Sequence, residues 1–421
     1  MFERAYRQRL EGDVTRWQMD GVITPATGNA IRTTLGPLPS GVNIASVVGI
    51  VGGLLIGAAF LAFVAANWSE IARPARFAML LAGIAAAYAL GAWFDRGGRA
   101  FLADSAVSIG CIIFGAAIAL VGQMYHLGGD FAGAMLLWAA AALAAAALTG
   151  SRGALAVALV VGSIWSGMRV QEEADVPHLA FVAFWLIAAI LAVRWNASVA
   201  RHLVALAAVA WWLTAGITLS TLFSVGNATL VVAAGAALML GAGLAMANWG
   251  SPSLRAFGLT LSTYGALVFA IAVAWTVSGV LHGRVRPLPW WIGASGVSGV
   301  GLSLAAAGIG RRAGPALAGL SAVLGLAVVA AMARRVGGDE PWLVYALALA
   351  SMLSLVMSGM LDEVRPRIVP GWIGLACVIA GITWALEGSL LERSIFLAIA
   401  GIVAIAIANA LGRFMPKEAM T

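Results

Sequence analysis

Long apolar runs recur along the chain, and short segments with charge, glycine or proline separate them. A helix needs about 20 apolar residues to cross a bilayer, and it satisfies its own backbone hydrogen bonds there. The pattern therefore predicts an all-α, polytopic membrane protein with about fourteen spanning helices. The expected spans lie near residues 42–66, 73–93, 100–121, 131–149, 153–169, 176–193, 199–220, 227–247, 255–281, 289–310, 312–333, 341–361, 368–387 and 391–412.

The composition excludes a soluble protein. Of the 421 residues, 62% are hydrophobic and 10% are charged, and the mean hydropathy is +0.96. Soluble domains average about 45–50% apolar and about 25% charged residues. A soluble core would not hide this much apolar surface, so the apolar runs belong in lipid.

The basic residues divide unevenly between the two sides of the predicted membrane. If the N-terminus is cytoplasmic, 17 of the 25 Lys and Arg residues lie on cytoplasmic segments and 8 lie outside. Cytoplasmic loops carry the excess of Lys and Arg, so the count predicts both termini inside. A net charge of +7 would suggest a nucleic-acid partner in a soluble protein, but these residues follow the orientation pattern, and we expect no nucleic acid.

Cysteine and histidine usage gives no sign of a metal or cofactor. Cys111 and Cys377 both lie inside apolar runs, and two cysteines are too few for a disulfide framework or a zinc site. No glycine-rich phosphate loop follows a strand-like segment. We therefore predict neither a metal site nor a cofactor.

Residues 1–40 differ from the rest of the chain because they hold five arginines and four acids. Apolar residues recur there at a spacing of three to four, which is typical of an amphipathic helix. Thr24-Pro25 then resembles a helix N-cap followed by proline at the first helical position. The sequence predicts a short helical hairpin that ends before Gly36-Pro37. The apolar positions are Phe2, Tyr6, Leu10, Val14 and Trp17.

The chain accordingly divides into three predicted parts. Residues 1–40 form a cytoplasmic amphipathic hairpin, residues 41–412 the transmembrane domain, and residues 413–421 a cytoplasmic tail. The hairpin is either an anchor on the bilayer surface or a docking site for a cytoplasmic protein.

The densest polar features follow the first and third predicted spans. The charge count places both on the outer face, so we expect them to meet and form one polar cluster. A single histidine is a poor metal ligand set, and Asn67 at a helix end also fits a helix C-cap. The candidate cluster consists of Asn67, Trp68, Glu70, Arg73, Gln123, Tyr125, His126 and Asp130.

Asp104 is the acid that the pattern places inside a spanning run, about one turn after Arg99. At that depth its carboxylate can reach the interface or pair with Arg99, so it is either a structural or a functional acid. No run carries paired carboxylates, a proton relay or an arginine stripe. This scarcity argues against a carrier that is coupled to ions through an intramembrane carboxylate.

Gly49, Gly53 and Gly57 form one face of the first predicted span. Glycines at this spacing allow two helices to approach closely. We expect this face to pack against another helix of the same chain.

Several of these segments together resemble a bacterial membrane-protein family catalogued as domain of unknown function 2157. They are residues 21–24, the segment 65–71 with Asn67-Trp68, the segment 115–126 with Gln123-Met124-Tyr125-His126, Gly129-Asp130 and Leu136-Leu137-Trp138. The resemblance covers roughly residues 10–160. It implies an integral membrane location and no established activity, and it transfers no catalytic residues. We expect a multi-pass protein of the bacterial inner membrane.

The tripeptide Ala66-Asn67-Trp68 recurs as Ala247-Asn248-Trp249. Each copy follows an apolar run and precedes another. The recurrence is either a coincidence or the trace of two seven-helix halves, 42–220 and 227–412. An odd unit would invert the second half, which is a common plan in transporters.

Three functions fit this sequence. A carrier or flippase-like transporter of a small or lipid-like substrate should contain a cavity among its helices. A scaffold or envelope-stress factor should act through residues 1–40. An enzyme on lipid-linked substrates should place His126 within hydrogen-bond reach of Glu70 or Asp130 in an open cleft.

Overall fold

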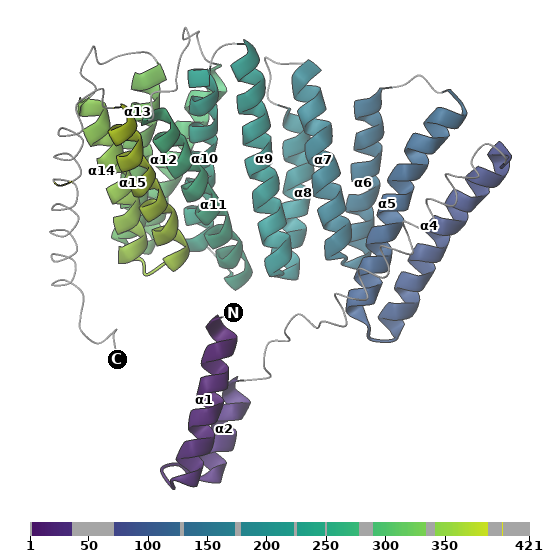
Figure 1. Ribbon diagram of the computed structural model, residues 1–421, viewed down its shortest axis with the longest axis horizontal. Coiled ribbons are helices and arrows are strands. Elements are labelled where there is room, and N and C mark those ends of the chain that lie inside the picture. Colours follow the sequence, from purple (N-terminus) through teal and green to yellow (C-terminus); the bar gives the residue numbers. More distant parts are fainter. Residues whose placement is uncertain are drawn as a thin grey trace. The chain divides into compact units, whose positions relative to one another are not determined.

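The computed structural model describes residues 2–35, 71–126, 130–172, 178–222, 225–248, 251–277, 289–333, 342–385 and 398. In these ranges every regular element is an α-helix (Figure 1). The chain separates into two compact units, Met1–Arg76 and Phe77–Thr421. Each unit is described by itself.

The first unit contains the predicted hairpin, formed by α1 (Phe2–Met19) and α2 (Pro25–Leu35). Val14, from the apolar stripe of α1, is 1% exposed. At the start of α2, the backbone amide of Thr27 donates to Oγ1 of Thr24 at 3.2 Å. This bond is the predicted N-cap, which satisfies one of the free amides at a helix start.

The second unit is built from long apolar helices, and α4 begins just before it. The predicted span 42–66 lies outside the described residues, and so does 391–412 apart from residue 398. Each of the others coincides with a helix, and eleven of these are long and apolar enough to cross a membrane, with α8 shorter. The helices are α4 (Arg73–Arg96), α5 (Ala100–Met124), α6 (Phe131–Thr149), α7 (Arg152–Glu172), α8 (Leu179–Trp195), α9 (Ser198–Leu222), α10 (Val225–Asn248), α11 (Pro252–Val277), α12 (Trp290–Gly310), α13 (Ala313–Ala333), α14 (Trp342–Leu361) and α15 (Arg365–Ala385).

Tight turns between these helices are made by residues with positive φ. Gly150, between α6 and α7, has φ +71° and donates its amide to the carbonyl of Ala146. Glycine adopts this conformation without steric cost. The turn lets α7 begin at Arg152, directly beside the end of α6.

Helix α10 is the centre of the second half of this unit, since it contacts α9, α11, α12 and α13. Glycines bring the backbones together there. A Cβ added to Gly299 of α12 would lie 2.4 Å from the carbonyl carbon of Ala237 in α10. A Cβ added to Gly265 of α11 would lie 2.5 Å from the backbone nitrogen of Leu240. Small residues at these positions allow the close approach that membrane helices use for packing.

Candidate functional site

A cavity of about 360 Å³ lies among α8, α9, α10, α11 and α12. Its wall contains no charged side chain and one hydroxyl, that of Ser295. Leu179 lines the cavity and is 65% exposed, so the cavity reaches the surface of the helices. The lining residues are Leu179, Phe181, Val182, Trp185, Ala208, Trp211, Trp212, Leu238, Met239, Ala242, Met246, Leu261, Trp291 and Ser295.

Four tryptophans line this wall, and they make specific contacts with neighbouring residues. The indole of Trp185 donates to the carbonyl of Val204 at 2.8 Å, which ties α8 to α9. The rings of Trp211 and Trp212 meet edge to face at 4.8 Å, and the ring of Trp291 lies 6.2 Å from that of Trp212. Gly235 of α10 leaves the space that the ring of Trp212 fills. The result is an aromatic and largely apolar surface, in which the buried Nε1 atoms of Trp211 and Trp291 have no acceptor among the described residues.

Asp104 lies in α5 and binds the start of α7. Its Oδ1 accepts from the hydroxyl of Ser151 and from the amide of Gly153, the latter at 3.1 Å. A carboxylate is favourable at a helix N-terminus, where free amides give a partial positive charge. Arg99 is not an ion-pair partner of Asp104 in the part of the chain that the structure describes. The sequence offered this pair or a position at the interface, and in the structure the carboxylate binds the start of α7.

The predicted outer cluster is described only in part. Gln123 ends α5 with Met124, and Tyr125 and His126 follow it in the turn, where His126 has φ +51°. Gln123, Tyr125 and His126 are exposed. Asp130, at the N-cap of α6, is exposed as well. Within the described ranges, the His126 side chain makes no hydrogen bond or ion pair with Asp130.

Asp130 pairs instead with Arg169, from the last turn of α7. The amide of Gly133 faces the carboxylate, although the contact is too loose for a capping hydrogen bond. That amide first, and then the Arg169 guanidinium, lower the pKa of Asp130 below its ordinary value. The pair joins α6 to α7 at this end of the helices.

The remaining members of the predicted cluster are Asn67, Trp68, Glu70 and Arg73. Asn67, Trp68 and Glu70 lie outside the described residues, as do Gly49, Gly53 and Gly57 of the predicted packing face. Arg73 is the first residue of α4 and belongs to the first unit. The convergence of the cluster therefore stays a prediction.

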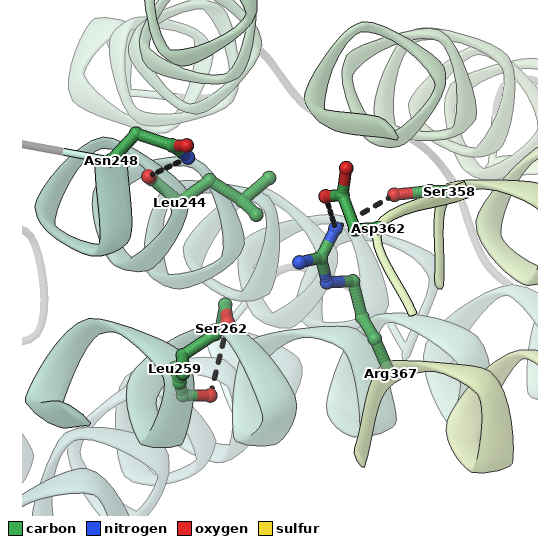
Figure 2. Close-up of polar contacts among 7 residues, drawn as sticks. All are labelled: Leu244, Asn248, Leu259, Ser262, Ser358, Asp362 and Arg367. Atoms are coloured by element: carbon green, nitrogen blue, oxygen red, sulfur yellow. Dashed lines mark hydrogen bonds and ion pairs between the residues drawn. The ribbon is translucent and has the colours of Figure 1, made fainter. Parts of the chain in front are cut away.

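An unexpected ion pair is buried between α14 and α15 (Figure 2). Nη1 of Arg367 donates to Oδ2 of Asp362 at 2.9 Å and to the hydroxyl of Ser358 at 3.0 Å. The two charged side chains are 2% and 4% exposed. Gly314 of α13 makes room for the carboxylate, because a Cβ there would lie 2.3 Å from it. Nε of Arg367 is buried without an acceptor among the described residues.

Comparison with known proteins gives one match. Residues 15–155 match the family Predicted membrane protein (DUF2157). The match confirms the resemblance drawn from the sequence, and it covers less than half of the chain. No curated protein and no solved structure matches the chain.

The DUF2157 segment contains the capping contact of Asp104 with Ser151, and it contains Asp130. The apolar cavity and the Asp362–Arg367 pair lie beyond its last residue. Arg367 is one of the 17 basic residues that the charge count assigns to cytoplasmic segments, and the sequence pattern gave no role to Asp362. The available signal was an acid and an arginine five residues apart on either side of Pro366, a spacing that a tight turn can close.

Proposed function

We propose that this protein is a carrier of a lipid-like molecule, which it binds in the apolar cavity among α8–α12. The observation that supports this proposal is the chemistry of the cavity wall. Fourteen residues line it, and none is Asp, Glu, Lys, Arg or His. A binding site for a polar or ionic solute needs polar groups that replace the water of that solute.

An apolar cavity favours an apolar occupant. Cavities with aliphatic and aromatic walls stay dry and accept small apolar molecules. In a bilayer the abundant molecules of that kind are lipid chains. The tryptophans around the cavity add flat surfaces against which a chain or a ring can pack. The sequence left open a small or a lipid-like substrate, and this wall favours the lipid-like one.

The membrane and the orientation of the protein belong to the same proposal. The membrane-spanning helices place the protein in a lipid bilayer. The charge count supports an orientation with both termini inside, and the proposed membrane is the bacterial inner membrane. The outer polar cluster would then lie at the periplasmic end, where it would act as a gate.

Transbilayer movement of a fluorescent phospholipid in proteoliposomes tests the carrier. Ala242→Phe places a phenyl ring in the cavity, so we expect it to abolish protein-dependent lipid movement. Ala305→Phe makes the same change at an exposed position of α12, and it should retain the wild-type rate. Equal rates in wild-type protein, both variants and protein-free vesicles would reject the carrier.

The scaffold hypothesis is addressed by deleting residues 1–40 in the same vesicles. A carrier that uses the α8–α12 cavity should keep its lipid movement without the hairpin. The truncated protein could fold and move lipid in vesicles and yet not replace the full-length protein in cells. That result would favour the scaffold hypothesis, in which residues 1–40 bind a cytoplasmic partner.

A further inference from the structure

A second cavity, of about 600 Å³, lies between α4, α5 and the junction of α6 with α7. Its volume falls within the range of about 300–1,000 Å³ that is usual for ligand pockets. It is separate from the α8–α12 cavity, and no residue lines both. Its lining residues include Gly91, Ala92 and Asp95 of α4, Ala103 and Asp104 of α5, and Arg152 of α7.

This cleft, defined by those residues, is polar at one end and apolar at the other. Asp95 lies in the last turn of α4 and Arg152 is the first residue of α7, so both charges lie at helix ends. Gly91, Ala92 and Ala103 lie further along the helices, and their small side chains leave the space open. Such a lining suits a molecule with a charged head and an apolar body.

The charges at the cleft are of both signs. Asp95 and Arg152 are exposed, and neither side chain makes an ion pair or hydrogen bond with another described residue. Asp104 also lines the cleft, and its Oδ1 accepts hydrogen bonds from the hydroxyl of Ser151 and the amide of Gly153. The cleft thus offers one guanidinium and two carboxylates, one of them fixed in position.

We propose that this cleft binds a zwitterionic amphiphile whose head carries a phosphate and a primary ammonium group, which is the chemistry of an ethanolamine phospholipid. Arg152 binds the phosphate, since guanidinium groups donate paired hydrogen bonds to phosphate oxygens. Asp95 and Asp104 accept from the ammonium group. The small residues Gly91, Ala92 and Ala103 pack against the part of the acyl chains that is nearest the head group. This binding does not depend on the proposed carrier function.

The primary amine gives the site its selectivity. A primary ammonium donates three N–H groups to carboxylates, whereas the methylated ammonium of a choline lipid donates none. A glycerol head lacks the positive charge altogether. The cleft should therefore prefer ethanolamine over choline lipids by about tenfold, the size of one charge-assisted hydrogen bond.

Retention of lipid by the full-length protein, measured by native mass spectrometry, tests this site. The protein is offered equal amounts of ethanolamine, choline and glycerol phospholipids with identical chains. Wild-type protein should retain the ethanolamine lipid about tenfold better. Asp95→Asn should reduce that lipid to the choline level, and Arg152→Gln should lower the retention of all three.

Matched controls separate specific binding from loss of folding. Arg96→Gln changes a neighbouring charge that does not line the cleft, and it should keep the wild-type preference. Ala92→Phe keeps every charge but fills the cleft, and it should remove the preference. Ala242→Phe should leave the preference intact, so failure of the carrier would not be mistaken for failure of this site.

Soluble glycerophosphoethanolamine distinguishes two sources of the same head group. Competition at millimolar concentration would support recognition of the free head. Persistent preference without competition would support the intact lipid. Equal retention of the three lipids by folded wild-type protein, or an unchanged preference in Asp95→Asn, would overturn the proposal.

Discussion

The contact between α10 and α12 predicts that alanine has very different effects on stability at two glycines of α12. A Cβ on Gly299 would lie 2.4 Å from the carbonyl carbon and oxygen of Ala237 and 2.6 Å from the amide of Leu238, whereas ordinary contact begins at 3.4 Å. Backbone atoms cannot move aside as the end of a side chain can. Gly301, two residues later, has nothing within 4 Å of its Cβ position.

We therefore expect Gly299→Ala to destabilise the protein and Gly301→Ala to leave it unchanged or slightly more stable. Overpacking costs about 1–3 kcal/mol, and alanine recovers at most about 1 kcal/mol of helix propensity. Because the opposing wall is backbone, the net loss for Gly299→Ala should be about 1–2 kcal/mol. Gly301→Ala obtains the propensity gain without the clash.

Thermal unfolding of the purified variants in one detergent measures this difference. The Tm of Gly299→Ala should fall by several degrees relative to Gly301→Ala. Leu238 lines the apolar cavity and its amide lies at this contact, so Gly299→Ala should also weaken lipid binding there. Equal Tm values for the two variants would refute the described packing of α10 on α12.

Three other contacts give predictions of their own. Arg367→Met should lower the free energy of unfolding by about 3–5 kcal/mol, because it leaves Asp362 charged and buried. The double variant with Asp362→Leu should recover most of this loss, and a double-mutant cycle with no coupling energy would contradict the ion pair. Asp104→Ala should cost about 0.5–2 kcal/mol in unfolding experiments, since the start of α7 loses its acceptor; an unchanged Tm would argue against the cap. Asp130 has a lowered pKa, so its stabilising contribution is complete above the unfolded pKa of about 3.9 and disappears as the pH falls through the lower folded pKa. The Tm difference between wild-type protein and Asp130→Asn should accordingly be constant at neutral pH and vanish in strong acid, and a difference that grows with acid would have the wrong sign.

The helices of the described residues could be predicted closely from the apolar runs. Hydropathy reports on length and burial in lipid, and those two quantities determine where a spanning helix begins and ends. The hairpin was equally accessible, because Thr24-Pro25 is a local capping signal and its bond forms within four residues. These features depend on neighbours in the sequence.

The sites could not be predicted in the same way, because they depend on which helices become neighbours. Ser151 is 47 residues from Asp104, and nothing in either segment indicates the other. Arg169 is 39 residues from Asp130. The apolar cavity draws on five helices and contains only residues that hydropathy counts as ordinary span. Asp362 and Arg367 were closer in sequence, but their burial depends on Gly314 of another helix.

Crosslinking with a photoactivatable phospholipid tests whether the α8–α12 cavity holds a lipid chain. A lipid with a diazirine in its acyl chain is reconstituted with the protein, irradiated, and the labelled residues are mapped by mass spectrometry. We expect labels on cavity residues such as Val182, Ala208 and Leu238. Ala242→Phe should remove these labels, and Ala305→Phe should retain them. Labels confined to exposed positions such as Val297 and Leu304, with the same yield in both variants, would contradict it.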